Sequence, residues 1–465
     1  MHESPAAGRD GEGVSAAARW GQGHMREDSP EYDVQAVLTG IANRARVSKT
    51  HRFGGLYSLL KEPYLRWSFQ QLNRRAAPGV DGESWREYAS ELDQRLPQLA
   101  ERLKRKAYRA RLIRRSYIPK SGGRKRPLGI PVVEDKAVQY GGAKILEAIY
   151  EADFIEYSFA YRPGRGAKDA VYELNKQIQF GRFRWAVEAD IRGFFDNLGH
   201  AWTVRMLEHR IKDRAFVGLI HKWLKAGVME DMQTVIHPGA GTPQGGVISP
   251  MLANIYLHYA LDLWFEKVVK RRCRGRALLI RYADDFVCLF QYKEDAEQFY
   301  ADLPQRLGKF GLEVATEKTR LLKFTRFDTG PKNESFEFLG FEFRWGLNRQ
   351  YKPQVKRRTS RARMRKAVAE MTAWLRGKAR GLSIRQMMQR LHSKLLGHWN
   401  YYGVHGNSDS LWEYWALVGR LLHKWLNRRS QRRSYSWEQL KRLLQRHAVA
   451  KPRIIERGRL RLGFA

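Results

Sequence analysis

The spacing of apolar residues along the chain predicts a mixture of helices and strands. Residues 34–72 carry scattered apolar positions typical of short helices, and a Pro-Gly turn at 77–82 ends them. Compact apolar runs at 183–190 and 278–290 predict strands, with helical segments between them. Leucines three and four residues apart predict a helix within residues 83–107: Leu92, Leu96, Leu99 and Leu103.

The pattern changes after about residue 350. Residues 351–380 contain eleven Lys and Arg against Glu370 alone, and helical spacing with many Trp and Tyr continues to about 445. We expect no strong strand there and predict a second, all-helical domain whose Trp and Tyr side chains mainly form its core. Residues 1–30 are rich in Gly, Ala and Ser without apolar periodicity, which predicts a disordered tail.

The charge of the chain indicates a polyanionic partner. Its 465 residues include 85 Lys and Arg against 48 Asp and Glu, a net charge of +37, and 43% apolar residues exclude a mainly disordered chain. Nucleic acid is the favoured partner, and a basic scaffold protein or a membrane-surface protein is the alternative. The two cysteines, Cys273 and Cys288, exclude a disulfide framework and a Cys-based zinc site. Without a transmembrane-length apolar run or a signal sequence, the chain is expected to be intracellular and cytoplasmic.

Two glycine-containing segments are candidates for phosphate or ligand contact. A Gly-Gly turn between two strand-like runs predicts a hairpin at 117–131, and residues 101–126 hold twelve Lys and Arg and one acid, Glu101. A solvated hairpin is the alternative, but this excess favours phosphate contact. A second loop, 239–250, leads into the apolar run 251–263, and its glycines suit either close approach to a ligand or plain flexibility.

Three aspartates carry the candidate chemistry. Asp284 and Asp285 break an apolar run into two halves, which predicts a tight β-hairpin with the pair at its tip. Aspartate is an ordinary turn former, yet two carboxylates beside a buried core repel each other unless a cation lies between them. Asp190 ends the strand before it in the same way. Such a set suits two Mg²⁺ ions, and together the three suggest nucleotidyl transfer.

Eight stretches in this order resemble the reverse transcriptases encoded by group II introns, also called intron maturases. They are PGVDG at 78–82, IPK at 118–120 with RPLGIP at 126–131, SFAYRPGRG at 158–166, EADIRGFFD at 188–196, TPQGGVISP at 242–250, YADD at 282–285, EKT at 317–319 and FLGF at 338–341. GHWNYY at 397–402 and WLNRRSQRRS at 425–434 resemble the thumb, or X, domain of maturases. The ordered set is far more specific than YADD alone.

The resemblance implies an α+β right-hand polymerase: fingers and a palm with an antiparallel palm sheet, followed by an all-helical thumb/X (maturase) domain. The implied boundaries are 1–30 for the tail, 31–130 for the N-terminal extension and fingers, 131–345 for fingers and palm, 346–430 for the thumb/X domain and 431–465 for a basic C-terminal segment.

By motif, Asp190, Asp284 and Asp285 would be the catalytic, metal-binding triad. The Ile191 carbonyl would be a further ligand of the two Mg²⁺ ions. Lys318 would protonate the leaving pyrophosphate.

The resemblance also implies a nucleotide pocket. Lys120 and Arg126 would hold the incoming triphosphate, the Arg bidentately and the Lys as a point charge. Phe195 matches the bulky residue beneath the sugar, where a ring leaves no room for a 2′-hydroxyl. Gln244 and Gly245 would line the nucleotide and template pocket.

The implied activity is RNA-directed DNA polymerisation that also assists intron splicing and mobility. The partners would be group II intron RNA, an RNA template with a DNA primer or target DNA, and dNTPs; no membrane partner is implied, and a homodimer stays open. Basic residues of the hairpin and the C-terminal part are the candidate RNA contacts: Arg114, Arg115, Arg124, Lys125, Arg357, Arg358, Arg361, Arg428, Arg429, Arg432 and Arg433.

One feature departs from many members of that family, which end in a His-Asn-His endonuclease domain with cysteine pairs. No Cys follows Cys288, so we expect that domain to be lacking. The four residues that could suggest a nuclease lie within the helical pattern, and no further metal-ligand cluster accompanies them: His398, Asn400, His405 and Asn407.

Two other functions stay open as alternatives. One is a splicing factor without polymerase activity, which the complete carboxylate set disfavours. The other is a reverse transcriptase adapted to phage defence, which the maturase-like thumb disfavours.

Overall fold

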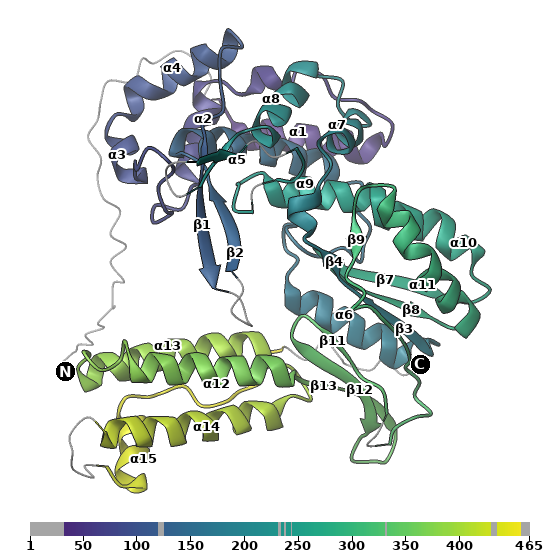
Figure 1. Cartoon of the computed structure of the whole chain (residues 1–465), viewed down its shortest axis with the longest axis vertical. Helices are drawn as coiled ribbons and strands as arrows, with labels where there is room; N and C mark the ends of the chain where they lie inside the picture. The colour runs from purple at the N-terminus through teal and green to yellow at the C-terminus, as the bar shows by residue number, and fades with distance from the viewer. Residues whose placement is uncertain are drawn as a thin grey trace, which may run out of the picture. The chain divides into compact units, whose positions relative to one another are not determined.

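A four-stranded antiparallel sheet with the order β10–β3–β8–β7 carries the candidate carboxylates (Figure 1). The strands predicted at 183–190 and 278–290 are confirmed, and the second run is a hairpin. The strands are β3 (Trp185–Ala189), β7 (Ala277–Tyr282), β8 (Asp285–Phe290) and β10 (Arg320–Lys323). The structure, a computed structural model, describes residues 32–119, 125–230, 234–236, 239–242, 244–330, 333–428 and 435–456.

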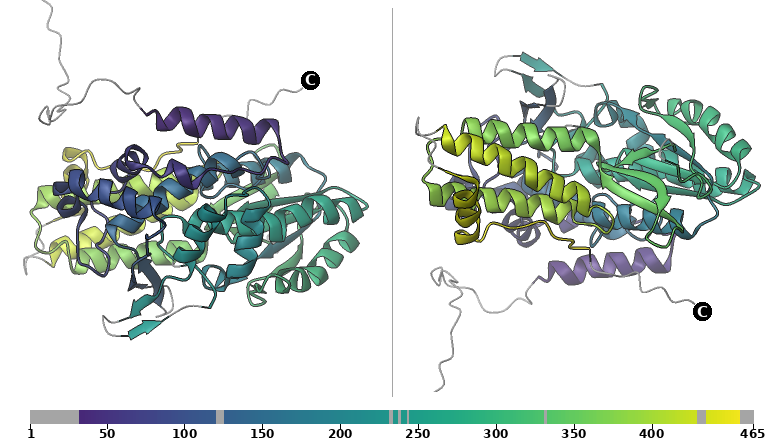
Figure 2. Two further views of the ribbon diagram at one scale, coloured as in Figure 1. Left: turned by 90° about the horizontal axis from the view of Figure 1, so that it is seen from above. Right: turned by 90° about the horizontal axis from the view of Figure 1, so that it is seen from below.

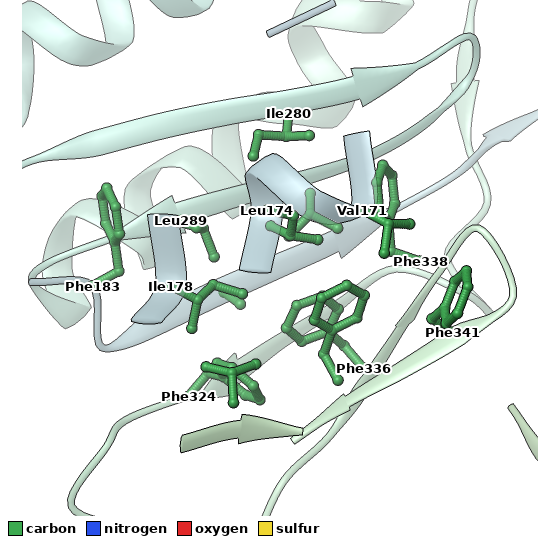
Figure 3. Packing of buried hydrophobic residues seen from close by; sticks show 14 of the residues in the cluster. Val171, Leu174, Ile178, Phe183, Ile280, Leu289, Phe324, Phe336, Phe338 and Phe341 are labelled. Carbon is green, nitrogen blue, oxygen red and sulfur yellow. The ribbon is translucent and has the colours of Figure 1, made fainter. Parts of the chain in front are cut away.

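Both faces of this sheet are buried, which explains why its strands appear in the sequence as continuous apolar runs. Successive side chains point to opposite faces. Ile280 and Leu289 face α6, whose buried stripe includes Leu174 (Figure 3). On the other face, the ring of Phe290 lies 5.3 Å from that of Phe299 on α11. The two covering helices are α6 (Ala167–Phe180) and α11 (Lys293–Gly308).

A second, three-stranded antiparallel sheet joins the same apolar cluster and extends past residue 350 (Figure 3). The strands are β11 (Phe336–Phe338), β12 (Phe341–Leu347) and β13 (Pro353–Thr359). The expectation of no strong strand after about residue 350 is therefore wrong. In β13 the buried positions are Val355, Arg357 and Thr359, so an inward-facing arginine conceals the period-two pattern.

The N-terminal part consists of helices beside the basic hairpin, as predicted. α1 packs along α5 (Figure 2), and the helix expected at 83–107 is present as two successive helices. The hairpin is confirmed, and β1 also pairs in parallel with β5, giving the order β2–β1–β5–β6. The elements are α1 (Val34–Val47), η1 (Tyr57–Leu59), α2 (Glu62–Gln70), α3 (Trp85–Ser90), α4 (Leu92–Lys104), β1 (Ile113–Pro119), β2 (Lys125–Ile130), α5 (Val133–Tyr150), α7 (His200–Glu208), α8 (Arg214–Leu224), β5 (Val228–Glu230) and β6 (Thr234–Ile236).

The apolar run 251–263 lies in a helical rod that extends beyond it at both ends. It begins as α9 (Ser249–Leu257), passes through two π-helical turns, η4 (His258–Asp262) and η5 (Phe265–Val269), and ends as α10 (Lys270–Arg272). A π turn inserts an extra residue and so changes which side chains face the sheet.

Four C-terminal helices share an apolar core of their own (Figure 2). Trp374 and Trp399 are buried in it, as expected, whereas Trp412 and Trp437 are half exposed. The helices are α12 (Arg361–Arg376), α13 (Ile384–Tyr402), α14 (Ser408–Asn427) and α15 (Trp437–Arg446). Within the ranges given above, the helices are all too short or too polar to cross a bilayer.

An extended segment after α15 returns along these helices to the three-stranded sheet. The Trp399 indole donates a hydrogen bond to the Ala450 carbonyl (2.9 Å), and the Ile455 amide donates one to the Gly403 carbonyl (2.8 Å). The next residue, Glu456, pairs through both carboxylate oxygens with Arg357 of β13 (2.9 and 2.8 Å).

Candidate active site

Neighbouring strands bring the aspartates to one end of the four-stranded sheet. Ala189 of β3 pairs with Phe286 of β8. Because the two strands are antiparallel, Asp190, which directly follows β3, lies beside Asp285 at the start of β8. A short pairing between β4 (Ile191–Arg192) and β9 (Glu313–Val314) then directs the chain away from the sheet.

Asp284 and Asp285 lie at the β7–β8 hairpin, as predicted, but only one of them is in the turn itself. Tyr282 pairs with Asp285 across a two-residue turn made of Ala283 and Asp284. Asp284 therefore lies in the turn, whereas Asp285 is the first residue of β8. Ala283 has a φ of +57°, a left-handed conformation that costs free energy for a residue with a Cβ.

The carboxylates at this end of the sheet are short of positive charge. Burial raises the pKa of Asp285 to about 7, and the charges of Asp190 and Asp284 add to this, while a hydrogen bond from the Leu339 amide (3.4 Å) opposes it. Burial, with the Asp190 charge, likewise raises the pKa of Asp284. A cation placed among these groups would favour their ionised forms.

Two basic side chains supply part of that charge. The Lys318 ammonium group pairs with the Asp190 carboxylate. Arg126 of β2 and Lys318 both act to lower the pKa of Asp284. The structure thus places Lys318 and Arg126 close enough to act on the charges of the aspartates at this end of the sheet.

The donor set fits a divalent cation by its chemistry. Among the residues with described positions, no three His, Cys, Asp or Glu side chains are arranged as a ready metal site. Carboxylate oxygens nevertheless arrive from two adjacent strands, and the raised pKa values of Asp284 and Asp285 show that added positive charge would stabilise their ionised forms. Hard cations such as Mg²⁺ prefer such oxygen ligands.

The glycine loop lies against the turn that follows Asp190. Phe195 in η3 (Phe194–Asn197) is 8% exposed, and its carbonyl accepts a hydrogen bond from the Thr242 amide (2.8 Å). Gly241 has a φ of +94°, and a Cβ there would lie 2.7 Å from the Asp196 carbonyl oxygen. A larger residue at position 241 would force the loop away from Phe195.

The same loop also contacts the basic hairpin. The Gly129 amide of β2 donates to the Gln244 carbonyl (2.7 Å). Gly245 has a φ of +116°, and a Cβ there would lie 2.8 Å from the Gly129 carbonyl oxygen. These two glycines allow the loop to approach the backbone of the chain itself, at Asp196 and at Gly129.

Comparison with known proteins agrees with this geometry. A family model described as "Reverse transcriptase (RNA-dependent DNA polymerase)" matches residues 118–343. Group II intron-encoded protein LtrA of Lactococcus lactis subsp. cremoris is 36% identical over 226 residues, which is 48% of this chain and 37% of LtrA. Protein YkfC of Escherichia coli K12 is 31% identical over 328 residues, 64% of this chain and 84% of YkfC.

The chain belongs to the group II intron-encoded reverse transcriptases and maturases. Its fold is accordingly an α+β reverse transcriptase domain followed by helices. An apo telomerase from Candida tropicalis, truncated from its C-terminal domain, aligns at 14% identity with a TM-score of 0.39 over 52% of this chain and 54% of that one, a score too low to add to the argument.

Several residues expected at the sites of this intron-encoded reverse transcriptase lie outside the described ranges. They are Lys120, Arg124, Arg429, Arg432 and Arg433. Ile191 is described and begins β4, directly after Asp190.

The candidate RNA contacts divide into internal and exposed side chains. Arg357 is 2% exposed and is held by Glu456, and Arg114 donates twice to the Pro78 carbonyl (3.0 and 2.7 Å), so both brace the fold. Arg358 pairs with Glu342 (2.7 Å). Lys125 and Arg361 are exposed, Arg428 lies over the Trp425 ring, and Arg115 lines a cavity of about 350 Å³ with Tyr117 and Asp196.

Two of the four C-terminal residues that could suggest a nuclease are partly or fully buried. The His398 ring stacks on Tyr414 with centroids 4.1 Å apart, and burial lowers the pKa of His398 to about 4. Asn407 is buried and accepts a hydrogen bond from the Thr359 amide (2.8 Å). Both side chains therefore serve packing.

Two residues near the carboxylates were missed by the sequence analysis. Arg281 of β7 is fully buried and donates to the Ala283 carbonyl (3.1 Å) in the turn that contains Asp284. A single charge inside an otherwise apolar strand was the available signal. Tyr161 has a φ of +57°, and the Asp284 carboxylate contributes to raising its pKa, after burial. Nothing in its sequence context indicated that conformation.

Proposed function

We propose that this chain is an RNA-directed DNA polymerase that adds dNTPs to a primer 3′ end with two Mg²⁺ ions and binds group II intron RNA to assist splicing and mobility. The observation that carries the proposal is the meeting of Asp190, Asp284 and Asp285 at one end of the sheet, with Lys318 and Arg126 beside them. LtrA, of which the match covers 37%, is named as a group II intron-encoded protein.

The carboxylates and the Ile191 carbonyl would hold the two ions. Divalent cations bound there would lower the pKa of the primer 3′-hydroxyl and would stabilise the negative charge of the leaving pyrophosphate. The protein provides closely placed carboxylate oxygens, and a cation bound among them would favour their ionised forms.

Lys318 acts as the proton donor in this proposal. In the structure its ammonium group is paired with Asp190. Lys318 would give up a proton from its ammonium group to the leaving pyrophosphate as the P–O bond breaks.

The remaining residues bind and select the nucleotide. Arg126 and Lys120 hold the triphosphate, and Gln244 with Gly245 lines the pocket. The buried Phe195 ring, fixed through its carbonyl to the glycine loop, blocks the space of a 2′-hydroxyl.

The proposed domain assignment follows the motifs. We assign residues 31–130 to the N-terminal extension and fingers, 131–345 to fingers and palm, 346–430 to the thumb/X domain and 431–465 to a basic C-terminal segment. Nuclear intron maturase 2, mitochondrial, of Arabidopsis thaliana is 26% identical over 176 residues, which cover 30% of this chain and 24% of that protein, and its name supports the maturase part of the proposal.

Primer extension on an RNA template with a DNA primer, dNTPs and Mg²⁺ tests the polymerase. The double variant Asp284→Asn/Asp285→Asn should extend at least about 1000-fold more slowly than the parent chain, because it keeps the shape of the site and removes its charge. Asp93→Asn, at a side chain that is 89% exposed, is the matched control and should extend normally. The double variant should be at least as stable as the parent, since it removes two mutually repelling carboxylates.

Three results would change the assignment. Equal extension by parent and double variant would show that these carboxylates do not perform the chemistry. Extension without added divalent ion would refute the Mg²⁺ assignment. No extension by either protein, with tight RNA binding retained, would favour the splicing factor without polymerase activity.

A further inference from the structure

A basic groove opens between the outer face of the three-stranded sheet and the first turns of α12 and α14. Its volume is about 900 Å³. Six cationic side chains and two carboxylates, Asp409 and Glu413, line it. The cations are Arg344, Arg349, Lys356, Arg358, Arg361 and Arg365. Three separate elements thus direct a net charge of +4 into one concave surface.

Among the described residues, most of these cations have no carboxylate within ion-pair distance. Arg358 pairs with Glu342, but among the described residues the other five form no ion pair. Arg349, Arg361 and Arg365 are exposed. Since neighbouring like charges repel each other, a concave cluster of this kind is stabilised by a polyanion that fills it.

The start of α14 adds backbone donors to the same groove. Asn407 precedes the helix but makes no cap hydrogen bond, because its side-chain oxygen accepts from Thr359 and its amide donates to the Thr359 hydroxyl and the Tyr402 carbonyl. Ser408 and Ser410 of the first turn line the groove. Helix amides at an N-terminus favour phosphate oxygens, and they supplement the cationic side chains here.

The groove faces away from the layer that carries the carboxylates. In β12, Phe343 and Trp345 point into the apolar cluster beneath the sheet, whereas Arg344 between them points outward into the groove. The Leu339 amide that contacts Asp285 lies before β12, on the turn from β11. The groove therefore lies on the outer face of the three-stranded sheet, whereas the carboxylates lie at one end of the four-stranded sheet.

We infer that this groove binds the phosphodiester backbone of folded RNA at the same time as a template–primer occupies the carboxylate site. The inference rests on the proposed function only in naming RNA as the polyanion. The hydrogen-bond donors of the groove are guanidinium, ammonium and amide N–H groups, which bind phosphate oxygens and do not select among the bases.

Binding of a labelled RNA hairpin with a 20-base-pair stem tests the inference, with a saturating unlabelled RNA–DNA template–primer present throughout. The groove variant is Arg344→Gln/Arg349→Gln/Arg361→Gln/Arg365→Gln. It should bind the hairpin at least about tenfold more weakly at physiological salt, and the slope of log affinity against log salt should fall by up to about 3.

A matched control removes four charges elsewhere. Lys212→Gln/Arg214→Gln/Lys267→Gln/Arg271→Gln changes exposed side chains outside the groove and should bind the hairpin within about twofold of the parent. Circular dichroism and thermal melting of both variants establish that they fold.

The outcomes separate the inference from the proposed polymerase. If both variants bound the RNA hairpin equally weakly, binding would be non-specific charge attraction and the inference would be refuted. Unchanged hairpin binding by a folded groove variant would refute it as well. Equal weakening toward a DNA hairpin of the same sequence would overturn its assignment to RNA. Failure of the parent chain to extend a primer would refute the polymerase and leave the hairpin result standing.

Discussion

The buried pair of Arg281 and Asp262 should control both the stability of the four-stranded sheet and the position of the turn between β7 and β8. The two side chains are 0% exposed, and the guanidinium group binds both carboxylate oxygens at 2.7 and 2.5 Å. Its third nitrogen donates to the Asn254 side chain and to the Ala283 carbonyl, both at 3.1 Å. One side chain therefore links the helical rod to the turn that contains Asp284.

Removing the cation alone should be costly. Arg281→Met leaves Asp262 buried without a partner, a situation that typically costs about 3–5 kcal/mol. The Arg281 charge opposes the burial that raises the pKa of Asp262, so its loss raises that pKa further. A folded-state pKa above the unfolded value means that the variant regains stability as pH falls, so the deficit should be smaller at pH 5 than at pH 8.

Two further variants separate charge from geometry. The double variant Arg281→Met/Asp262→Leu should recover much of the lost stability, because apolar residues often replace a buried ion pair at little cost. It should still extend primers about 10- to 100-fold more slowly, since the Ala283 carbonyl has lost its donor and the carboxylates shift.

Urea unfolding and single-turnover primer extension measure the two effects. Arg320→Met, at a side chain 55% exposed and paired with Glu188, is the control and should lose less than about 1 kcal/mol. An Arg281→Met protein within 1 kcal/mol of the parent, or a double variant with parental extension rate, would refute the reasoning.

Three other expectations can be measured independently. Gly245→Ala should lower the free energy of unfolding by about 1–3 kcal/mol because of its positive φ and the Gly129 carbonyl, whereas Gly239→Ala, with open space around it, should be neutral; urea titration decides. Phe195→Ala should raise incorporation of rNTPs relative to dNTPs in single-nucleotide assays, and an unchanged ratio would show that the ring does not select the sugar. Burial lowers the pKa of His258 to about 3, below its unfolded value, so the parent should lose about 2 kcal/mol between pH 7 and pH 5 that His258→Phe does not lose; parallel slopes would contradict this.

The sequence was sufficient where local pattern determines structure. The apolar runs around Asp190, Asp284 and Asp285 predicted one strand and a β-hairpin, and antiparallel pairing of neighbouring strands was enough to bring the three carboxylates together. The leucine spacing at 83–107 and the Gly-Gly turn of the basic hairpin were similarly local signals.

Long-range pairing could not be predicted in the same way. Arg281 and Asp262 are 19 residues apart, and the π turn that contains Asp262 changes the helical period, so no sequence spacing indicates that they meet. Arg357 was expected on the RNA surface because it lies in a basic run, but its partner Glu456 is 99 residues away and places it inside. The number of charged residues in a segment predicts the sign of its surface charge, but it does not predict which of the charged side chains are buried.

The Arg357–Glu456 pair has a consequence for how the chain can be divided. A boundary placed after α15 would separate a complete set of helices from residues 449–456, yet this segment supplies the counter-ion of a buried arginine in the sheet. The C-terminal helices and the three-stranded sheet therefore cannot be exchanged independently of each other. A chimera that takes its C-terminal helices from a relative must take the returning segment, and an acid at its end, from the same parent as β13.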